Sequence, residues 1–169
     1  MSKSKLRKEI AAMSHEQLEQ IILDAYDARA DIKEYFEFFL NPDIEKLLEK
    51  HKKKVYKELL RTKWGSSKAR VSVIKQCVKN FIGFNPGVEA VLDMLFLTLE
   101  MMCLTERHVD LTPTQDRYVT ALVHQILKTA DAHEIVAQTM ERLQNFISMG
   151  AYTYKIKRLL KESIEDYPA

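Results

Sequence analysis

Glycine and proline are scarce in this chain, which has four of each among 169 residues. A protein built from many short β-strands needs these residues at its turns, so their scarcity argues against an all-β fold. Hydrophobic residues make up 46% of the chain and charged residues 30%, a composition typical of a globular protein with a packed core. We therefore expect an all-α protein.

Cysteines and long apolar runs are also few. Cys77 and Cys103 lie within apolar helical patterns, which argues against a disulfide scaffold and favours a reducing compartment. The most apolar segment, Val88 to Leu104, contains three acidic residues and is shorter than the roughly 20 apolar residues that cross a bilayer. The segment MSKSKLRKEIAAM lacks the apolar stretch of a secretory signal. We expect a cytoplasmic protein with no membrane segment.

Motifs for catalysis and for metal binding are missing from the sequence. The five histidines are never three or four residues apart, as a helical zinc site requires. The sequence has no glycine-rich phosphate loop, no GxSxG elbow and no CxxC pair. Both cysteines lie in mid-helix patterns, without the nearby base or helix start that activates a thiol. We predict no catalytic residue, no cofactor and no metal.

Capping signals divide the chain into helices. Ser14 with Gln17 and Thr112 with Gln115 have the spacing of capping boxes, while Asn85-Pro86 and Asp131 with Glu134 predict further helix starts. The predicted helices span residues 5–13, 14–29, 32–40, 42–61, 68–82, 85–107, 112–130, 131–150 and 152–164.

Short connections make successive helices pack antiparallel. We therefore predict a multi-helix array of antiparallel helical hairpins, which forms either a compact bundle or a short superhelical stack. The fixed patterns of tetratricopeptide, ankyrin and leucine-rich repeats do not recur in the sequence. A single helical domain over residues 1–169 is expected. The aromatic side chains at positions 35, 36, 38 and 39 are expected in its core.

Positive charge is concentrated in one internal segment, Lys46 to Lys79. This segment holds twelve lysines and arginines against two acidic residues, a net charge of +10. The overall net charge is only +2, so the rest of the chain carries −8. Local fields of this kind steer charged partners more than the total charge does.

Spacing places part of this charge on one side of a helix. Five cations recur at intervals of 4, 3, 4 and 4 residues and form one stripe, opposite a face that holds Val55 and Leu59. With Trp64 as a stacking surface, these cations and their neighbours are candidates for binding an anion or a partner. The candidate residues are Lys46, Lys50, Lys53, Lys57, Arg61, Lys63, Lys68, Lys75 and Lys79.

Two interpretations of the stripe stay open. In one, the stripe is a solvated face or pairs with upstream acidic residues. Those acids are Asp24, Asp27, Asp31, Glu34 and Glu37. In the other, the stripe binds an anionic partner outside the protein.

Arg70 differs from the other cations. A helical projection places it among Ile74, Cys77 and Phe81, and a charge on an apolar face needs a partner. We predict a buried charge at Arg70, paired with a carboxylate such as Asp93 or Glu100.

Several segments together carry a family resemblance. They are Lys5–Glu9, Glu16–Leu18, Leu23–Asp27, Lys33–Pro42, Glu45–Lys50 and Lys68–Arg70. With them the chain resembles an uncharacterised family of small helical bacterial proteins, mainly over residues 5–70. The resemblance implies a cytoplasmic bacterial protein and supplies no catalytic residues.

The lack of catalytic and metal-binding motifs, together with the helical pattern, favours a non-enzymatic helical protein-interaction module. The sequence does not identify its protein partner. The alternative is a nucleic-acid-associated protein that binds phosphates through the basic Lys46–Lys79 face.

Overall fold

The computed structural model describes residues 2–64 and 66–167. The chain divides into two compact units, Met1–Asp43 and Ile44–Ala169. Helices dominate both units, and a two-stranded hairpin is the only sheet among the described residues. The all-α prediction is therefore confirmed. The single domain over residues 1–169 stays a prediction.

The first unit contains three short helices, α1 (Lys3–Ala11), α2 (His15–Ala28) and α3 (Ala30–Leu40). The predicted capping box at the start of α2 is present, because Ser14 accepts a hydrogen bond from the Gln17 amide and the Gln17 side chain accepts one from the Ser14 amide. Helices α2 and α3 pack as a hairpin.

No described residue of these three helices is buried. Tyr35 is 40% exposed and Phe39 is 65% exposed, so the prediction that the aromatic group at positions 35–39 lies in a core is wrong. The rings instead contact one another, with 6.5 Å between the centroids of Tyr35 and Phe39. A unit of three short helices has too little interior to enclose them.

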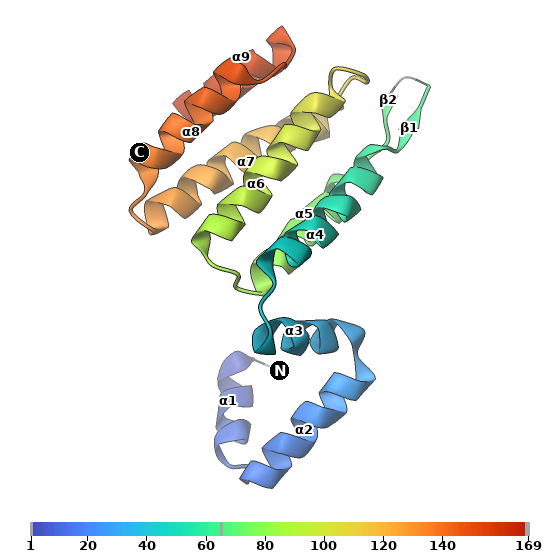
Figure 1. Cartoon of the computed structure of the whole chain (residues 1–169), viewed down its shortest axis with the longest axis vertical. Coiled ribbons are helices and arrows are strands. Elements are labelled where there is room, and N and C mark those ends of the chain that lie inside the picture. Colours follow the sequence, from blue (N-terminus) through green and yellow to red (C-terminus); the bar gives the residue numbers. More distant parts are fainter. Residues whose placement is uncertain (1, 65, 168–169) are drawn as a thin grey trace. The chain divides into compact units, whose positions relative to one another are not determined.

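The second unit contains six helices among its described residues. They are α4 (Ile44–Leu59), α5 (Val71–Gly83), α6 (Val88–Thr105), α7 (Pro113–Ala132), α8 (Val136–Met149) and α9 (Tyr154–Glu165). Consecutive helices form antiparallel hairpins, in which α4 packs on α5 and α6 on α7, while α8 and α9 of the last hairpin both pack on α7 (Figure 1). Because α6 also packs on α4, and α7 on α8 and α9, the hairpins stack side by side. Of the two predicted arrangements, the second unit has the stack.

The core of this unit lies around α6 and α7, which pack against each other and against both outer hairpins. Large side chains from all six helices are fully buried there, such as Phe81, Leu99, Leu122, Leu143 and Leu160. Removing this apolar area from water is the main force that holds the stack together. Although α6 is the most apolar helix, none of the described helices has the length and apolar character that a membrane crossing requires.

A small hairpin joins α4 to α5 where the sequence predicted a loop. Strands β1 (Thr62–Lys63) and β2 (Ser66–Ser67) pair antiparallel, while Gly65 lies outside the described residues. Helix α5 begins at Val71 and not at the predicted Lys68. The reason is a set of competing hydrogen bonds, because Gln115 on α7 donates to both Ser67 Oγ and the Ala69 carbonyl at 2.9 Å.

Other predicted helix starts had mixed outcomes. The capping box of Thr112 and Gln115 begins α7 as expected. The start predicted at Asn85 is wrong, because Gly87, with a φ of 97°, is the N-cap of α6. The start predicted at Asp131 is also wrong, since α7 continues through Ala132 and an N-cap needs a non-helical backbone.

Candidate binding groove between two helices

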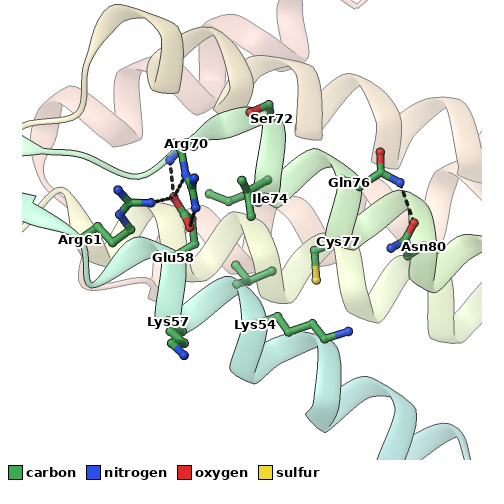
Figure 2. A pocket seen from close by; sticks show the side chains of 12 residues that line it. Lys54, Lys57, Glu58, Arg61, Arg70, Ser72, Ile74, Gln76, Cys77 and Asn80 are labelled. Carbon is green, nitrogen blue, oxygen red and sulfur yellow. Dashed lines mark hydrogen bonds and ion pairs between the residues drawn. The ribbon is translucent and has the colours of Figure 1, made fainter. Parts of the chain in front are cut away.

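A groove of about 640 Å³ runs between α4 and α5. It has the volume of a typical ligand or peptide pocket. Its lining residues come only from these two helices and their flanks, as Figure 2 shows. They are Lys54, Val55, Lys57, Glu58, Arg61, Arg70, Ser72, Val73, Ile74, Gln76, Cys77 and Asn80.

Helical periodicity explains how the groove is built. On α4, Lys54 and Glu58 are four residues apart and therefore share one face, and Arg61 follows just after the helix ends at Leu59. On α5, Val73 and Cys77 share a face in the same way. The adjacent apolar positions hold α4 and α5 together. These are Val55 and Ile74, of which 1% and 0% is exposed.

At one end of the groove a buried carboxylate joins the two elements. Glu58 Oε1 accepts hydrogen bonds from the Arg70 amide at 2.8 Å, from Arg70 Nε at 2.9 Å and from Arg61 Nη1 at 3.3 Å. Glu58 Oε2 accepts a fourth bond from Arg70 Nη2 at 3.0 Å. Figure 2 shows the Glu58 carboxylate between the two arginines. The arrangement ties the end of α4 to the start of α5.

These contacts set the protonation state of Glu58. The hydrogen bonds from the Arg70 side chain, aided by the Arg70 amide and by the charges of both arginines, lower the pKa of Glu58 from 4.5 to about 2. Burial opposes this shift, because it favours the neutral acid. Glu58 is therefore a structural carboxylate that stays ionised, and it has little capacity to act as a general base or acid near neutral pH.

The prediction of a buried charge at Arg70 is wrong. Its side chain is 57% exposed, and Arg70 is the N-cap of α5 and not a residue on its apolar face. The buried member of the ion pair is Glu58, whose side chain is 7% exposed. A partner from Asp93 or Glu100 was expected, but Asp93 pairs with Arg142 at 2.7 Å. The helical projection failed because the helix begins after Arg70.

All nine predicted cations are exposed. These are Lys46, Lys50, Lys53 and Lys57 on α4, Arg61 between α4 and β1, Lys63 on β1, Lys68 after β2, and Lys75 and Lys79 on α5. The groove brings together two of them, Lys57 and Arg61. Lys75 lies elsewhere, with its ammonium 5.2 Å from the centre of the Tyr118 ring on α7. The predicted stripe is thus a surface of α4 that only partly overlaps the groove.

The two walls of the groove differ in charge. The wall from α4 carries Lys54, Lys57 and Arg61. The wall from α5 carries uncharged side chains, with Ser72, Gln76 and Asn80 as its polar members. Gln76 donates to Asn80 Oδ1 at 2.7 Å. With Arg70 and Glu58 included, the lining has four cations and one carboxylate, a formal net charge of +3.

The thiol and imidazole beside the groove belong to the core. Cys77 is 8% exposed, and its thiol donates to the His51 carbonyl at 3.5 Å. Burial raises the pKa of Cys77 although Lys54 opposes the shift, and burial also raises the pKa of Cys103. His51 is 1% exposed and lies edge-on to Phe81. Among residues 2–64 and 66–167, no cluster of three or more metal-ligating side chains occurs.

Sequence reasoning missed two residues that line the groove, Lys54 and Glu58. Lys54 was counted within the basic segment but not within the stripe, although its spacing of four residues to Glu58 places both on one face. Glu58 was counted only as one of the two acidic residues in the segment Lys46 to Lys79. The signal available for it was its position four residues after Lys54 and three before Arg61, inside a run of cations.

A family model described as "Family of unknown function (DUF6155)" matches residues 1–146. No curated protein and no solved structure matches the chain. The match extends well beyond residues 5–70, to which the sequence resemblance was mainly limited. Because it covers most of the chain, the chain belongs to this family of unknown function.

Proposed function

We propose that this member of a helical family of unknown function is a non-enzymatic protein-interaction module that binds a protein partner in the groove between α4 and α5. One observation carries the proposal, namely that the groove combines an apolar floor with a cationic wall. The floor includes Val55, Val73 and Cys77, and the wall includes Lys57 and Arg61. Protein interfaces combine an apolar centre with a charged rim in this way.

The titratable groups of the groove support a role without catalysis. Glu58 is held ionised by two arginines, with a pKa of about 2. Burial raises the pKa of Cys77, and a nucleophilic thiol needs a lowered pKa. The remaining ionisable side chains that line the groove are lysines and arginines. This set is better suited to binding an anionic surface than to proton transfer or nucleophilic attack.

Nucleic-acid binding is the second candidate function. Trp64 favours it, because its side chain is 91% exposed next to Lys63 and offers a flat surface for a base. Phosphate binding, however, depends on charge and makes no use of an apolar floor. Trp64 does not line the groove. We therefore place the protein-binding proposal first.

We further propose that the module acts in the cytoplasm of a bacterium. The bacterial source rests on the sequence resemblance, and the support for the cytoplasm is that Cys77 and Cys103 are both buried free thiols. Unpaired thiols of this kind persist in a reducing compartment.

Charge reversal on α4 tests the proposed function. The full chain and three variants, Lys57→Glu, Lys53→Glu and Lys128→Glu, are used to capture partners from a cell extract. Lys57 lines the groove, Lys53 is an exposed cation of α4 outside it, and Lys128 is exposed on α7. We expect Lys57→Glu to lose the captured protein, while the other two variants keep it. Equal capture by all three variants would refute the proposal that the partner binds in the groove.

A titration with generic double-stranded DNA and single-stranded RNA separates the two candidate functions. Fluorescence polarisation is measured at about 50 mM and about 200 mM salt, over which a protein that contacts many phosphates loses affinity steeply. We expect little binding at either salt concentration. Tight binding at low salt that falls by orders of magnitude at high salt would favour the nucleic-acid function instead.

A further inference from the structure

We propose that the occupant of the groove is an amphipathic α-helix of a partner protein with acidic side chains along one edge only. This inference rests on the proposed function and deepens it by naming the chemistry of the partner. It follows from the difference between the two walls, from the spacing of the cations on α4 and from the absence of backbone partners in the groove.

The charge difference between the walls predicts the acidic edge. Lys54, Lys57 and Arg61 stand on the α4 side, whereas the lining residues of α5 from Ser72 to Asn80 are uncharged, and Arg70 at the N-cap of α5 is paired with Glu58. An occupant with acids on both edges would leave one row of carboxylates desolvated without a partner, which costs free energy. A helix with acids on the edge next to α4, and neutral polar residues on the other edge, matches both walls.

The spacing of the cations predicts a register. Lys54 and Lys57 are three residues apart on α4, so their Cα atoms lie about 4.5 Å apart along the helix axis, while Arg61 follows after the helix has ended at Leu59. A partner helix that packs at a small angle to α4 presents side chains at the same repeat. Acids one turn apart on the partner, at positions i and i+3 or i+4, would therefore meet Lys54 and Lys57, and a further acid beyond them would approach Arg61.

The backbone of the groove favours a helical occupant over an extended one. The lining segments of α4 (Lys54 to Glu58) and α5 (Val73 to Asn80) lie inside helices, where amides and carbonyls bond within the helix. An extended peptide would have to pair its own backbone groups with such a surface and would find few partners. A helix satisfies its own backbone and can place its apolar side chains against Val73, which is 37% exposed.

The end of the groove near Glu58 is ordered before binding. Arg70 is held by Glu58 through Nε and Nη2 at 2.9 and 3.0 Å, and Arg61 is held at 3.3 Å. Both arginines nevertheless remain about half exposed, at 57% and 47%. Side chains that are already positioned lose less conformational entropy on binding. This end, with two arginines near Lys57, is where the acidic edge should bind most strongly.

Two synthetic peptides of about 18 residues, long enough to form a helix when bound, test the inference. Both contain the same leucines, glutamates and glutamines. In the edge peptide the glutamates form one row beside the leucine stripe, and in the scrambled peptide they are spread around the helix. Fluorescence polarisation with the full chain gives the two dissociation constants. We expect the edge peptide to bind about tenfold or more tightly than the scrambled peptide.

Variants of the full chain locate the binding. Lys57→Glu, on the cationic wall, and Val73→Asp, on the apolar floor, should each raise the dissociation constant of the edge peptide about tenfold. Lys128→Glu should leave this dissociation constant unchanged. Val73 is 37% exposed, so its substitution leaves the core intact, and circular dichroism checks that every variant is folded.

Three outcomes would overturn the inference. Equal affinity for both peptides would refute the acidic edge, and no binding of either peptide would refute the helical occupant. In both cases the proposed function survives if, in the capture experiment with cell extract, the wild-type chain retains a protein partner and Lys57→Glu does not. Tighter binding of single-stranded RNA than of the edge peptide, lost in Lys57→Glu, would refute the inference and the proposed function together.

Discussion

Replacing Glu58 by glutamine tests the ion-pair cluster that joins α4 to α5. The carboxylate accepts four hydrogen bonds from Arg61 and Arg70, which lower its pKa to about 2. A pKa that lies below its unfolded value of about 4.3 by roughly two units corresponds to about 3 kcal/mol of stability at neutral pH. Because Arg70 is 57% exposed, solvent screening reduces this contribution. We expect Glu58→Gln to lower the free energy of unfolding by about 2 kcal/mol.

The same cluster predicts a pH dependence. The folded pKa of Glu58 lies below the unfolded pKa, so the ionised carboxylate stabilises the fold fully above about pH 5 and loses its contribution as the pH falls toward 2. The difference in unfolding free energy between the wild-type chain and Glu58→Gln should therefore be largest at neutral pH. At about pH 3 it should be less than half as large.

Urea unfolding followed by far-ultraviolet circular dichroism measures this difference at both pH values. Glu49→Gln is the matched control, because Glu49 is an exposed acid on the same helix that pairs with Lys52 at 3.1 Å. Its loss should cost about 0.5 kcal/mol or less. If Glu58→Gln were no more destabilising than Glu49→Gln, or if its effect did not change between the two pH values, the reasoning about the cluster would be refuted.

Three further predictions concern the stack and its thiols. Gln115→Ala removes the side-chain bond to Ser67 and half of a capping box, so it should lower the free energy of unfolding in urea by about 2 kcal/mol. Leu122→Ala, at a position with no exposed surface, should cost about 2–5 kcal/mol in the same assay, and a loss below 1 kcal/mol would contradict its place in the core. Cys77 and Cys103 should react with iodoacetamide much more slowly in the folded chain than in denaturant, because burial raises the pKa of both. Equal rates in the two states would contradict this assignment.

Much of the second unit could be predicted from local sequence. Thr112 and Gln115 cap α7 as their spacing indicates, because a capping box depends only on residues three positions apart. The two sides of α4 follow in the same way from a repeat of 3.6 residues. The start of α6 could not be predicted, because the backbone at Gly87 takes a φ of 97° and displaces the start expected at Asn85.

The candidate groove depended on contacts that local patterns do not contain. Glu58 and Arg70 are twelve residues apart and meet across a hairpin. That hairpin is held in turn by Gln115, 48 residues further along the chain than Ser67. The sequence placed the run of cations on α4, whose role stays a prediction, but it assigned the buried charge to Arg70 instead of Glu58. Only the packing of α4 against α5 decides which member of the pair is enclosed.

Amide chemical shifts test the central claim most directly, because they locate binding on the chain. The edge peptide is added to the ¹⁵N-labelled full chain, and two-dimensional spectra are recorded through the titration. We expect the largest shifts along the facing sides of α4 and α5, around Val55, Val73 and Cys77, and we expect Lys57→Glu to need about tenfold more peptide to reach the same shifts. Shifts confined to the hairpin around Trp64, or spread over α7 to α9, would contradict the central claim.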